Sequence, residues 1–334
     1  MAQGSPQERL WYAGAGDRKL ITTRVSKLLD IKYPLLQGGM AWLATGRLAA
    51  AVSKAGGLGI IAAGSADANW LQNEIDVFRK ITDKPFGVNI MLISPHLDEI
   101  MDLVIKEKVP VVTTGAGNPG KYIPLLKESG CRVIPVVASV ALARRLERQG
   151  ADALIAEGTE AGGHIGEMTT MCLVPMVVDA VEIPVIAAGG IADGRGAAAA
   201  FILGAEGVQM GTRFICAEES PVHADYKERV IQCRDRDTVV CGISTGHPVR
   251  VIKNQFSRLY LSKEREGLET AELDRMGAGR YPAAFQGDVE NGSLLCGQCA
   301  GLVEKVEPAI EIIEDVMETA VRILKGVGSE LCLK

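Results

Sequence analysis

The residues best suited to chemistry in this chain stand in the stretch 157–166, which reads EGTEAGGHIG. This stretch places His164, one of only four histidines, directly after the pair Gly162-Gly163. A histidine exchanges a proton near neutral pH, and adjacent glycines let a flat partner approach the backbone without meeting a Cβ atom. The pattern is typical either of chemistry beside a cofactor or of a simple turn with a hydrogen-bonded histidine. The elements around it must decide between the two.

Short apolar runs recur along the chain from residue 34 onward, and each predicts a buried strand. The eight runs are 34–37, 58–62, 86–91, 109–113, 133–137, 153–156, 184–188 and 207–211. They begin about every 20 to 30 residues, a spacing that fits one strand, one helix and two loops. Eight such units in succession favour a TIM (β/α)8 barrel with a C-terminal lid and helical extension over a doubly wound sheet.

Several of the intervening helices have recognisable boundaries. Ser94 and Ser139 are predicted N-caps, and Asp193 opens a helix that runs through four alanines. Gly150 is the residue at which the helix after Ser139 is expected to end.

The regular alternation ends near residue 214 and divides the chain into three parts. Residues 1–21 are interpreted as an N-terminal extension or a cloning remnant, and residues 22–214 as the barrel. Residues 215–334 are expected to form a polar, irregular lid followed by a helical segment that packs on the barrel. The expected inward stripe of that last segment is Ile310, Ile313, Val316 and Val321.

Composition limits the classes of function. The net charge of −5 and the lack of a lysine- or arginine-rich block argue against a nucleic-acid partner. No apolar run is long enough to span a membrane, so we expect a soluble cytoplasmic protein with a small-molecule or protein partner. The eight cysteines are expected to be free thiols. Cys296 and Cys299 form a lone C-x-x-C pair, which is interpreted as structural because a zinc site needs further ligands; no metal is expected.

In barrels of this kind the active site lies at the C-terminal ends of the strands, so the residues directly after each apolar run are the candidates. These ends are rich in glycine and in uncharged polar groups. The candidate cofactor-binding residues are Gly39, Met40, Ala41, Asn89, Thr113, Glu157, Gly162, Gly163, Ala188, Gly189, Gly190, Gln209, Met210, Gly211 and Thr212. His164 is the candidate catalytic residue.

The loops after strands seven and eight of a barrel commonly bind a phosphate through backbone N–H groups. The residues expected to bind it here are Gly189, Gly190, Gly211 and Thr212. A sugar phosphate and FMN both fit this expectation. A sugar-phosphate enzyme would need an acid/base pair or a lysine close by, whereas the amides of Asn89 and Gln209 suit the uracil-like edge of a flavin better.

Six motifs carry a resemblance to a known family. They are QGGMAW at 37–42, GGLG at 56–59, KPFGVN at 84–89, TTGAGNP at 113–119, EAGGHIG at 160–166 and AAGGIA at 187–192. Over roughly residues 22 to 330 the chain resembles the bacterial FMN-dependent enoyl-acyl-carrier-protein reductases II, a branch of the nitronate monooxygenase superfamily. STGHPVR at 244–250 and GDV at 287–289 also resemble this branch, whereas EAGGHIG is shared across the superfamily.

The resemblance implies FMN as cofactor, NADH or NADPH as co-substrate, and a trans-2-enoyl thioester of acyl carrier protein as substrate in fatty acid biosynthesis. Reduced flavin would give hydride from N5 to the β-carbon. His164 would protonate the α-carbon or stabilise charge on the thioester oxygen. The implied FMN contacts are Met40, Ala41, Asn89, Glu157, Gly163, Gly189, Gly190, Gln209 and Thr212. A homodimer through the C-terminal region and a monovalent cation are further expectations.

Two other functions remain open at this stage. One is oxidation of nitronates with FMN and O2, and the other is a non-catalytic flavin- or phosphate-binding scaffold. The chain departs from the reductase pattern at GRYPAA in 279–284 and at the two cysteines of the C-x-x-C pair, and both changes concern the acyl tunnel. Three cations, Arg250, Lys253 and Arg258, are expected on about two helical turns. They form either an ordinary solvated face or a contact with the carrier protein or the dinucleotide.

Overall fold

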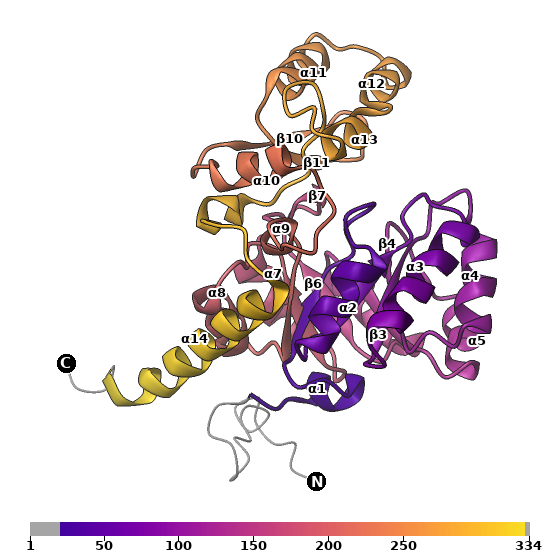
Figure 1. Ribbon diagram of the computed structural model, residues 1–334, viewed down its shortest axis with the longest axis vertical. Coiled ribbons are helices and arrows are strands. Elements are labelled where there is room, and N and C mark those ends of the chain that lie inside the picture. The colour runs from indigo at the N-terminus through magenta and orange to yellow at the C-terminus, as the bar shows by residue number, and fades with distance from the viewer. Residues whose placement is uncertain (1–20, 331–334) are drawn as a thin grey trace.

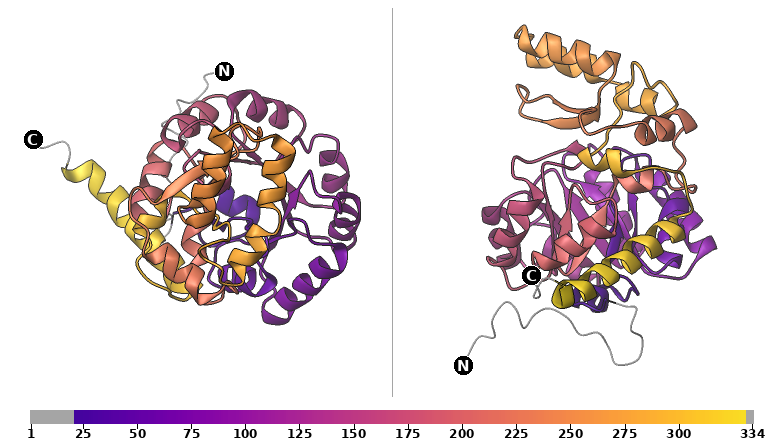
Figure 2. Two further views of the ribbon diagram at one scale, coloured as in Figure 1. Left: turned by 90° about the horizontal axis from the view of Figure 1, so that it is seen from above. Right: turned by 90° about the vertical axis from the view of Figure 1, so that its left-hand side faces the viewer.

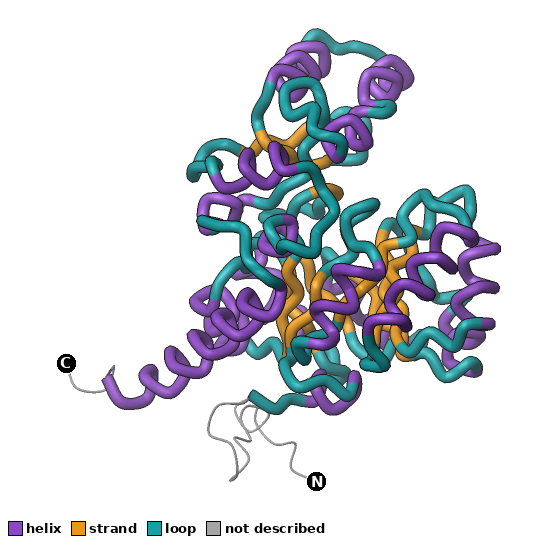
Figure 3. Tube along the Cα trace, in the orientation of Figure 1, coloured by secondary structure: helices purple, strands orange, loops and turns teal. Residues whose placement is uncertain are grey.

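The computed structural model describes residues 21–330, with side chains described to residue 326. Its centre is a barrel of eight parallel strands surrounded by helices (Figure 1, Figure 3). The strands are β1 (Leu35–Gln37), β2 (Gly59–Ala62), β3 (Phe86–Met91), β4 (Val111–Gly115), β5 (Arg132–Val137), β6 (Leu154–Glu157), β8 (Val185–Ala188) and β9 (Gly207–Met210). The extension predicted for residues 1–21 lies outside the described residues, except for Ile21.

The strands follow one another around the barrel in the order β1-β9-β8-β6-β5-β4-β3-β2. The two ends of this sheet meet at a parallel bridge between Leu36 and Leu58. There the Leu58 N–H donates to Leu35 O at 2.9 Å, and the Gln37 N–H donates to Leu58 O at 3.0 Å. The predicted (β/α)8 barrel is therefore confirmed, and each strand lies within a few residues of its predicted run.

Two apolar layers hold the barrel together. Leu36, Ile60, Ile134 and Ile186 belong to a fully buried cluster within the strands. The opposite strand faces and the surrounding helices form a second and larger cluster. Since both faces are covered, the strands must be apolar at nearly every position, which explains the unbroken apolar runs of the sequence.

The helices around the barrel are capped largely as the sequence indicates. They are α1 (Arg24–Leu29), α2 (Gly46–Lys54), α3 (Ala68–Ile81), α4 (Leu97–Lys106), α5 (Ile123–Glu128), α6 (Val140–Arg148), α7 (Thr170–Val178), α8 (Gly194–Ile202) and α9 (Thr212–Ile215). Ser139 accepts from the Leu142 N–H at the start of α6, and Asp193 accepts from the Arg195 and Gly196 N–H groups at the start of α8. Gly150 follows α6 with φ of 95°, as expected of a helix terminator.

The predicted N-cap at Ser94 was wrong. Helix α4 begins at Leu97 with His96 as its N-cap residue. Ser94 instead belongs to the preceding turn, where its hydroxyl accepts from the His96 N–H at 3.3 Å. A serine before a proline marks a turn as readily as a helix start, so the local pattern was ambiguous.

Residues 216–303 form a cap over the barrel mouth (Figure 2). The cap contains α10 (Ala224–Ile231), β10 (Thr238–Cys241), β11 (Val249–Ile252), α11 (Gln255–Arg265), α12 (Thr270–Gly277), α13 (Arg280–Phe285) and the 3-10 helix η2 (Gln298–Leu302). It is therefore not the irregular lid that its polar sequence suggested. Strand β11 pairs with β10 on one side and, on the other, with β7 (Gly163–His164) from the barrel loop.

The chain then returns to the barrel as α14 (Ala309–Glu330), which packs against α8 and α2. Ile313 and Val316 are buried as predicted, but Ile310 is 46% exposed and Ile312 takes its place in the core. The predicted stripe was wrong at Ile310, because the packed face of α14 runs through Ile312, Ile313, Val316, Met317 and Ala320. Within the described residues, no helix is long and apolar enough to cross a membrane.

Candidate functional site

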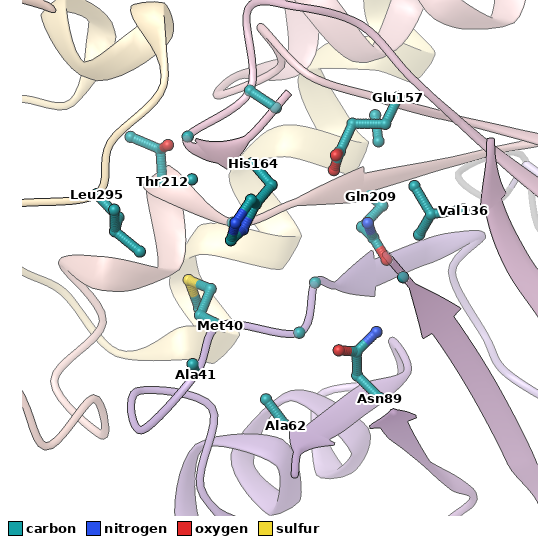
Figure 4. A pocket seen from close by; sticks show the side chains of 18 of the residues that line it. Met40, Ala41, Ala62, Asn89, Val136, Glu157, His164, Gln209, Thr212 and Leu295 are labelled. Atoms are coloured by element: carbon teal, nitrogen blue, oxygen red, sulfur yellow. The ribbon is translucent and has the colours of Figure 1, made fainter. Parts of the chain in front are cut away.

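A cavity of about 270 Å³ lies at the C-terminal ends of the barrel strands, beneath the cap. It brings together residues from nearly every barrel strand end, and Figure 4 shows several of their side chains pointing into it. The predicted residues that line it are Gly39, Met40, Ala41, Asn89, Glu157, Gly162, Gly163, His164, Ala188, Gly189, Gly190, Gln209, Gly211 and Thr212. The volume is close to the lower end of small-molecule sites, which range over roughly 300–1,000 Å³.

Two predicted residues, Thr113 and Met210, do not line the cavity. Thr113 is buried behind Asn89, and its hydroxyl accepts from Asn89 Nδ2 at 2.9 Å. The Met210 side chain belongs to the core, while its carbonyl accepts from the Gly38 N–H at 2.9 Å. Both therefore support the cavity wall without facing a ligand.

The polar groups of the cavity wall have free hydrogen-bonding capacity. In the part of the chain that the structure describes, the side chains of Glu157, His164 and Gln209 have no protein hydrogen-bond partner. Asn89 uses Nδ2 toward Thr113 and leaves Oδ1 free. Polar side chains enclosed in this way are normally satisfied, so unpaired groups converging on one space indicate a ligand site.

The Glu157 carboxyl has an unusual proton affinity. Burial raises its pKa from 4.5 to about 7. The side chain keeps some exposed surface, but that surface faces the cavity and not open solvent. At neutral pH the group is therefore partly protonated and can donate as well as accept a hydrogen bond.

His164 reaches the cavity from strand β7, which pairs with β11 of the cap. Val249 of β11 pairs with His164, and Arg250 pairs with Gly163. The pKa of the imidazole is lowered from 6.5, first by burial and then by the nearby His247. His164 is therefore mainly neutral at pH 7, with one ring nitrogen able to donate and the other able to accept.

Two glycines show why the cavity rim needs residues without side chains. A Cβ atom on Gly39 would lie 2.5 Å from Cβ and Cγ of Asn89, so glycine here lets the amide reach the end of β1. Gly189 has φ of 90°, and a Cβ atom there would lie 2.7 Å from the carbonyl oxygen of Gly158. Both positions therefore depend on glycine.

Three cavity residues that sequence reasoning missed come from the cap: Tyr281, Leu295 and Cys299. The hydroxyl of Tyr281 in α13 donates to the carbonyl of Ala41. Leu295 is held by a hydrogen bond from the Tyr226 hydroxyl to its carbonyl at 2.9 Å. Tyr281 and Cys299 lie where the sequence departs from the reductase pattern, a change expected to concern the acyl tunnel, whereas no sequence signal pointed to Leu295.

The expectation that the three cations share one helical face was wrong, although Arg258 is exposed on α11. Arg250 lies in strand β11, not on a helix, and is only 7% exposed. Its Nε and Nη2 atoms donate to Thr159 O at 3.1 and 3.0 Å. Arg250 therefore contacts the barrel loop rather than a carrier protein or a dinucleotide.

The C-x-x-C pair behaves as a structural element. Cys296 and Cys299 are both buried free thiols. Burial raises the pKa of Cys299 to about 11, which keeps the thiol protonated. Over residues 21–330 no group of histidine, cysteine and acidic side chains could hold a metal ion. Cys332 lies outside the described residues.

Comparison with known proteins places this site in a family. The family model described as "Nitronate monooxygenase" matches residues 22–103 and 96–319. The chain belongs to the nitronate monooxygenase family. This family member is 36% identical to a probable nitronate monooxygenase of Staphylococcus saprophyticus, over 91% of this chain and 99% of the relative. It is 35% identical to an octahydro-indene-carboxyl-CoA dehydrogenase of Mycobacterium tuberculosis, over 91% and 98%.

Two solved structures are similar to this chain over nearly its whole length. FabK from Thermotoga maritima is 54% identical, with a TM-score of 0.90 over 92% of this chain and 99% of that one. A nitroalkane oxidase from Streptomyces ansochromogenes is 29% identical, with a TM-score of 0.80 over 91% and 99%. The protein is therefore an oxidoreductase.

Proposed function

We propose that this protein uses FMN and NADH or NADPH to reduce trans-2-enoyl thioesters of acyl carrier protein in fatty acid biosynthesis. The observation that carries the proposal is the 54% identity to FabK over nearly both whole chains, against 36% to the probable nitronate monooxygenase. FabK is the reductase type that the sequence resembles. The difference favours the reductase branch of the family over the nitronate branch.

The cavity residues fit FMN. Oδ1 of Asn89 and the side-chain amide of Gln209 are unpaired and match the donor and acceptor edge of a flavin. The backbones of Gly39, Gly189 and Gly190 line the cavity, and backbone without side chains allows close approach of a flat ring system or a phosphate. FMN, when bound, supplies hydride transfer from the dinucleotide to the β-carbon of the enoyl thioester.

The protein's own groups then act on the thioester. Negative charge develops on its oxygen during reduction, and a hydrogen-bond donor at that oxygen lowers the barrier. His164 is neutral at pH 7, so it offers an N–H donor rather than a full positive charge. We assign to His164 hydrogen-bond donation to the thioester oxygen as its first role. Delivery of a proton to the α-carbon is the second role that we consider for the same imidazole.

The apolar part of the cavity suits the acyl chain. Leu43, Ile215, Tyr281 and Leu295 line this part, and the last two come from the cap. A cap that contributes to the wall keeps water from the reacting atoms. A cytoplasmic homodimer and a monovalent-cation requirement are further proposals, which rest on the resemblance to the reductase family.

An anaerobic reoxidation experiment separates the two oxidoreductase functions. The purified protein is reduced with one equivalent of NADH or NADPH without oxygen, and the flavin absorbance is followed after addition of crotonyl thioester. We expect rapid reoxidation by the thioester. Reoxidation by oxygen alone, together with turnover of alkyl nitronates, would establish nitronate oxidation instead. Protein that carries no flavin after purification and takes up none would contradict both.

A further inference from the structure

The segment 296–299 of the cap contacts the barrel mouth through two backbone N–H groups. The Gly297 N–H donates to Thr212 Oγ1 at 2.9 Å in a buried hydrogen bond. The Gln298 N–H donates to the carbonyl of Glu160 at 2.9 Å. One short segment of the cap therefore contacts both the loop after β6 and the first residue of α9, Thr212.

Position 297 needs a glycine because a side chain there has no space, and not because of its backbone conformation. Its φ of −79° and ψ of 167° are extended values that any residue adopts. A Cβ atom there would lie 2.8 Å from Glu160 O and 3.0 Å from Thr212 Oγ1. The contact is reciprocal, because a Cβ atom on Gly162 would lie 2.7 Å from Gly297 N. Any side chain at 297 must therefore push the cap away from the barrel loop or from Thr212.

The hydrogen bond from Gly297 determines what the Thr212 hydroxyl can offer. A hydroxyl has one donor hydrogen and two acceptor lone pairs, and the Gly297 N–H occupies one acceptor position. With this N–H donor on the cap side, the hydroxyl's own hydrogen is available to point into the cavity, which Thr212 lines.

We propose that Gly297 is a positioning residue for cofactor binding, because its N–H orients the Thr212 hydroxyl as a donor toward the phosphate of FMN. The inference rests on the proposed function, in which FMN occupies the cavity. It adds a residue from the cap to a phosphate site that otherwise consists of barrel loops. A hydrogen bond to a charged group contributes enough free energy for its loss to weaken binding by about tenfold or more.

The test compares FMN with riboflavin, which lacks the phosphate. Dissociation constants of both are measured by flavin fluorescence on flavin-free full-length protein, for wild type, Gly297→Ala and Gly277→Ala. Gly277 is the matched control, since it lies in the cap and a Cβ atom there meets nothing within 4 Å. We expect Gly297→Ala to weaken FMN by about tenfold or more while leaving riboflavin unchanged, and Gly277→Ala to change neither.

A double-mutant cycle with Thr212→Val shows whether Gly297 acts through the hydroxyl. If it does, Gly297→Ala causes no further loss of FMN affinity in the Thr212→Val background. Equal losses for FMN and riboflavin, unchanged FMN binding, or fully additive effects would each overturn the inference. Riboflavin binding by the variant also shows that it is folded. Failure of the wild type to bind either flavin would instead overturn the proposed function, and this inference with it.

Discussion

His164 combines an accessible imidazole with a fixed backbone. The side chain is exposed to the cavity, and its main chain is paired to β11. Burial and the neighbouring His247 lower its pKa, so the neutral form dominates at the pH where the protein would work. A neutral imidazole at a fixed position suits hydrogen-bond donation to a developing oxyanion.

Replacement of His164 by alanine tests this role. We expect His164→Ala to retain FMN but to lower turnover of the enoyl thioester by roughly 100-fold or more, the usual scale for loss of an acid/base group. Stopped-flow measurement of the flavin signal separates flavin reduction by the dinucleotide from reoxidation by the thioester, and only reoxidation should slow. His96→Ala is the control, because His96 lies at the start of α4, away from the cavity. Normal turnover in His164→Ala would assign the residue a structural role.

At the scale of elements, the loop after β6 depends on the cap for its position. Arg250 donates to the carbonyl of Thr159, and Gln298 N donates to that of Glu160. The Glu160 carboxylate in turn accepts from the Thr170 N–H at the start of α7 at 2.9 Å. The loop that carries Gly162, Gly163 and His164 is therefore fixed from both sides.

Replacement of Arg250 should loosen this loop. Arg250→Ala leaves the Thr159 carbonyl without its two N–H donors, which should lower the unfolding free energy by about 1–3 kcal/mol. Because His164 moves with the loop, we expect kcat to fall more than KM rises. Arg250→Lys should not restore kcat, since an ammonium lacks the planar pair of donors.

Arg258→Ala is the matched control for Arg250, as it removes an exposed cation from α11 in the same cap. It should change neither kcat nor stability. An Arg250→Ala variant with wild-type kcat and stability would show that the loop holds its position without the cap.

On the scale of the whole molecule, the barrel and the cap together enclose Glu157. Burial of its ionised carboxylate lowers the free energy of unfolding. Its pKa is about 7 in the folded protein against 4.5 for an ordinary glutamate. The folded state therefore binds this proton more tightly than the unfolded state. The resulting stabilisation is complete below pH 4.5 and is lost as the pH rises through about 7.

Glu157→Gln should remove this pH dependence, because glutamine cannot ionise. Relative to this variant, flavin-free wild-type protein should lose about 2–3 kcal/mol of unfolding free energy between pH 5 and pH 8. Urea denaturation of both proteins at the two pH values measures the difference. Parallel pH profiles would mean that the carboxyl ionises normally in the folded state.

Predictions of secondary structure from the sequence were wrong where one local pattern is compatible with several structures. The lid was expected to be polar and irregular, yet it contains regular helices such as α11, whose Asn254 cap accepts from the Ser257 N–H at 2.9 Å. Arg250 was expected on a helix, whereas cross-strand pairing with Val240 places it in a sheet. Local composition reports exposure, and it does not report which distant segment will pair with a given stretch.

The sequence by itself determined the barrel, its eight strands and most of the residues at its mouth. Each strand is buried on both faces, so its apolar run is visible without knowledge of its neighbours, and parallel strands all bring their ends to one rim. Only the tertiary structure decided how the mouth is closed. Tyr281 reaches Ala41, Gly297 reaches Thr212 and Arg250 reaches Thr159 across large separations in the chain. Such contacts depend on the path of the whole chain through space, and no local pattern of residues encodes them.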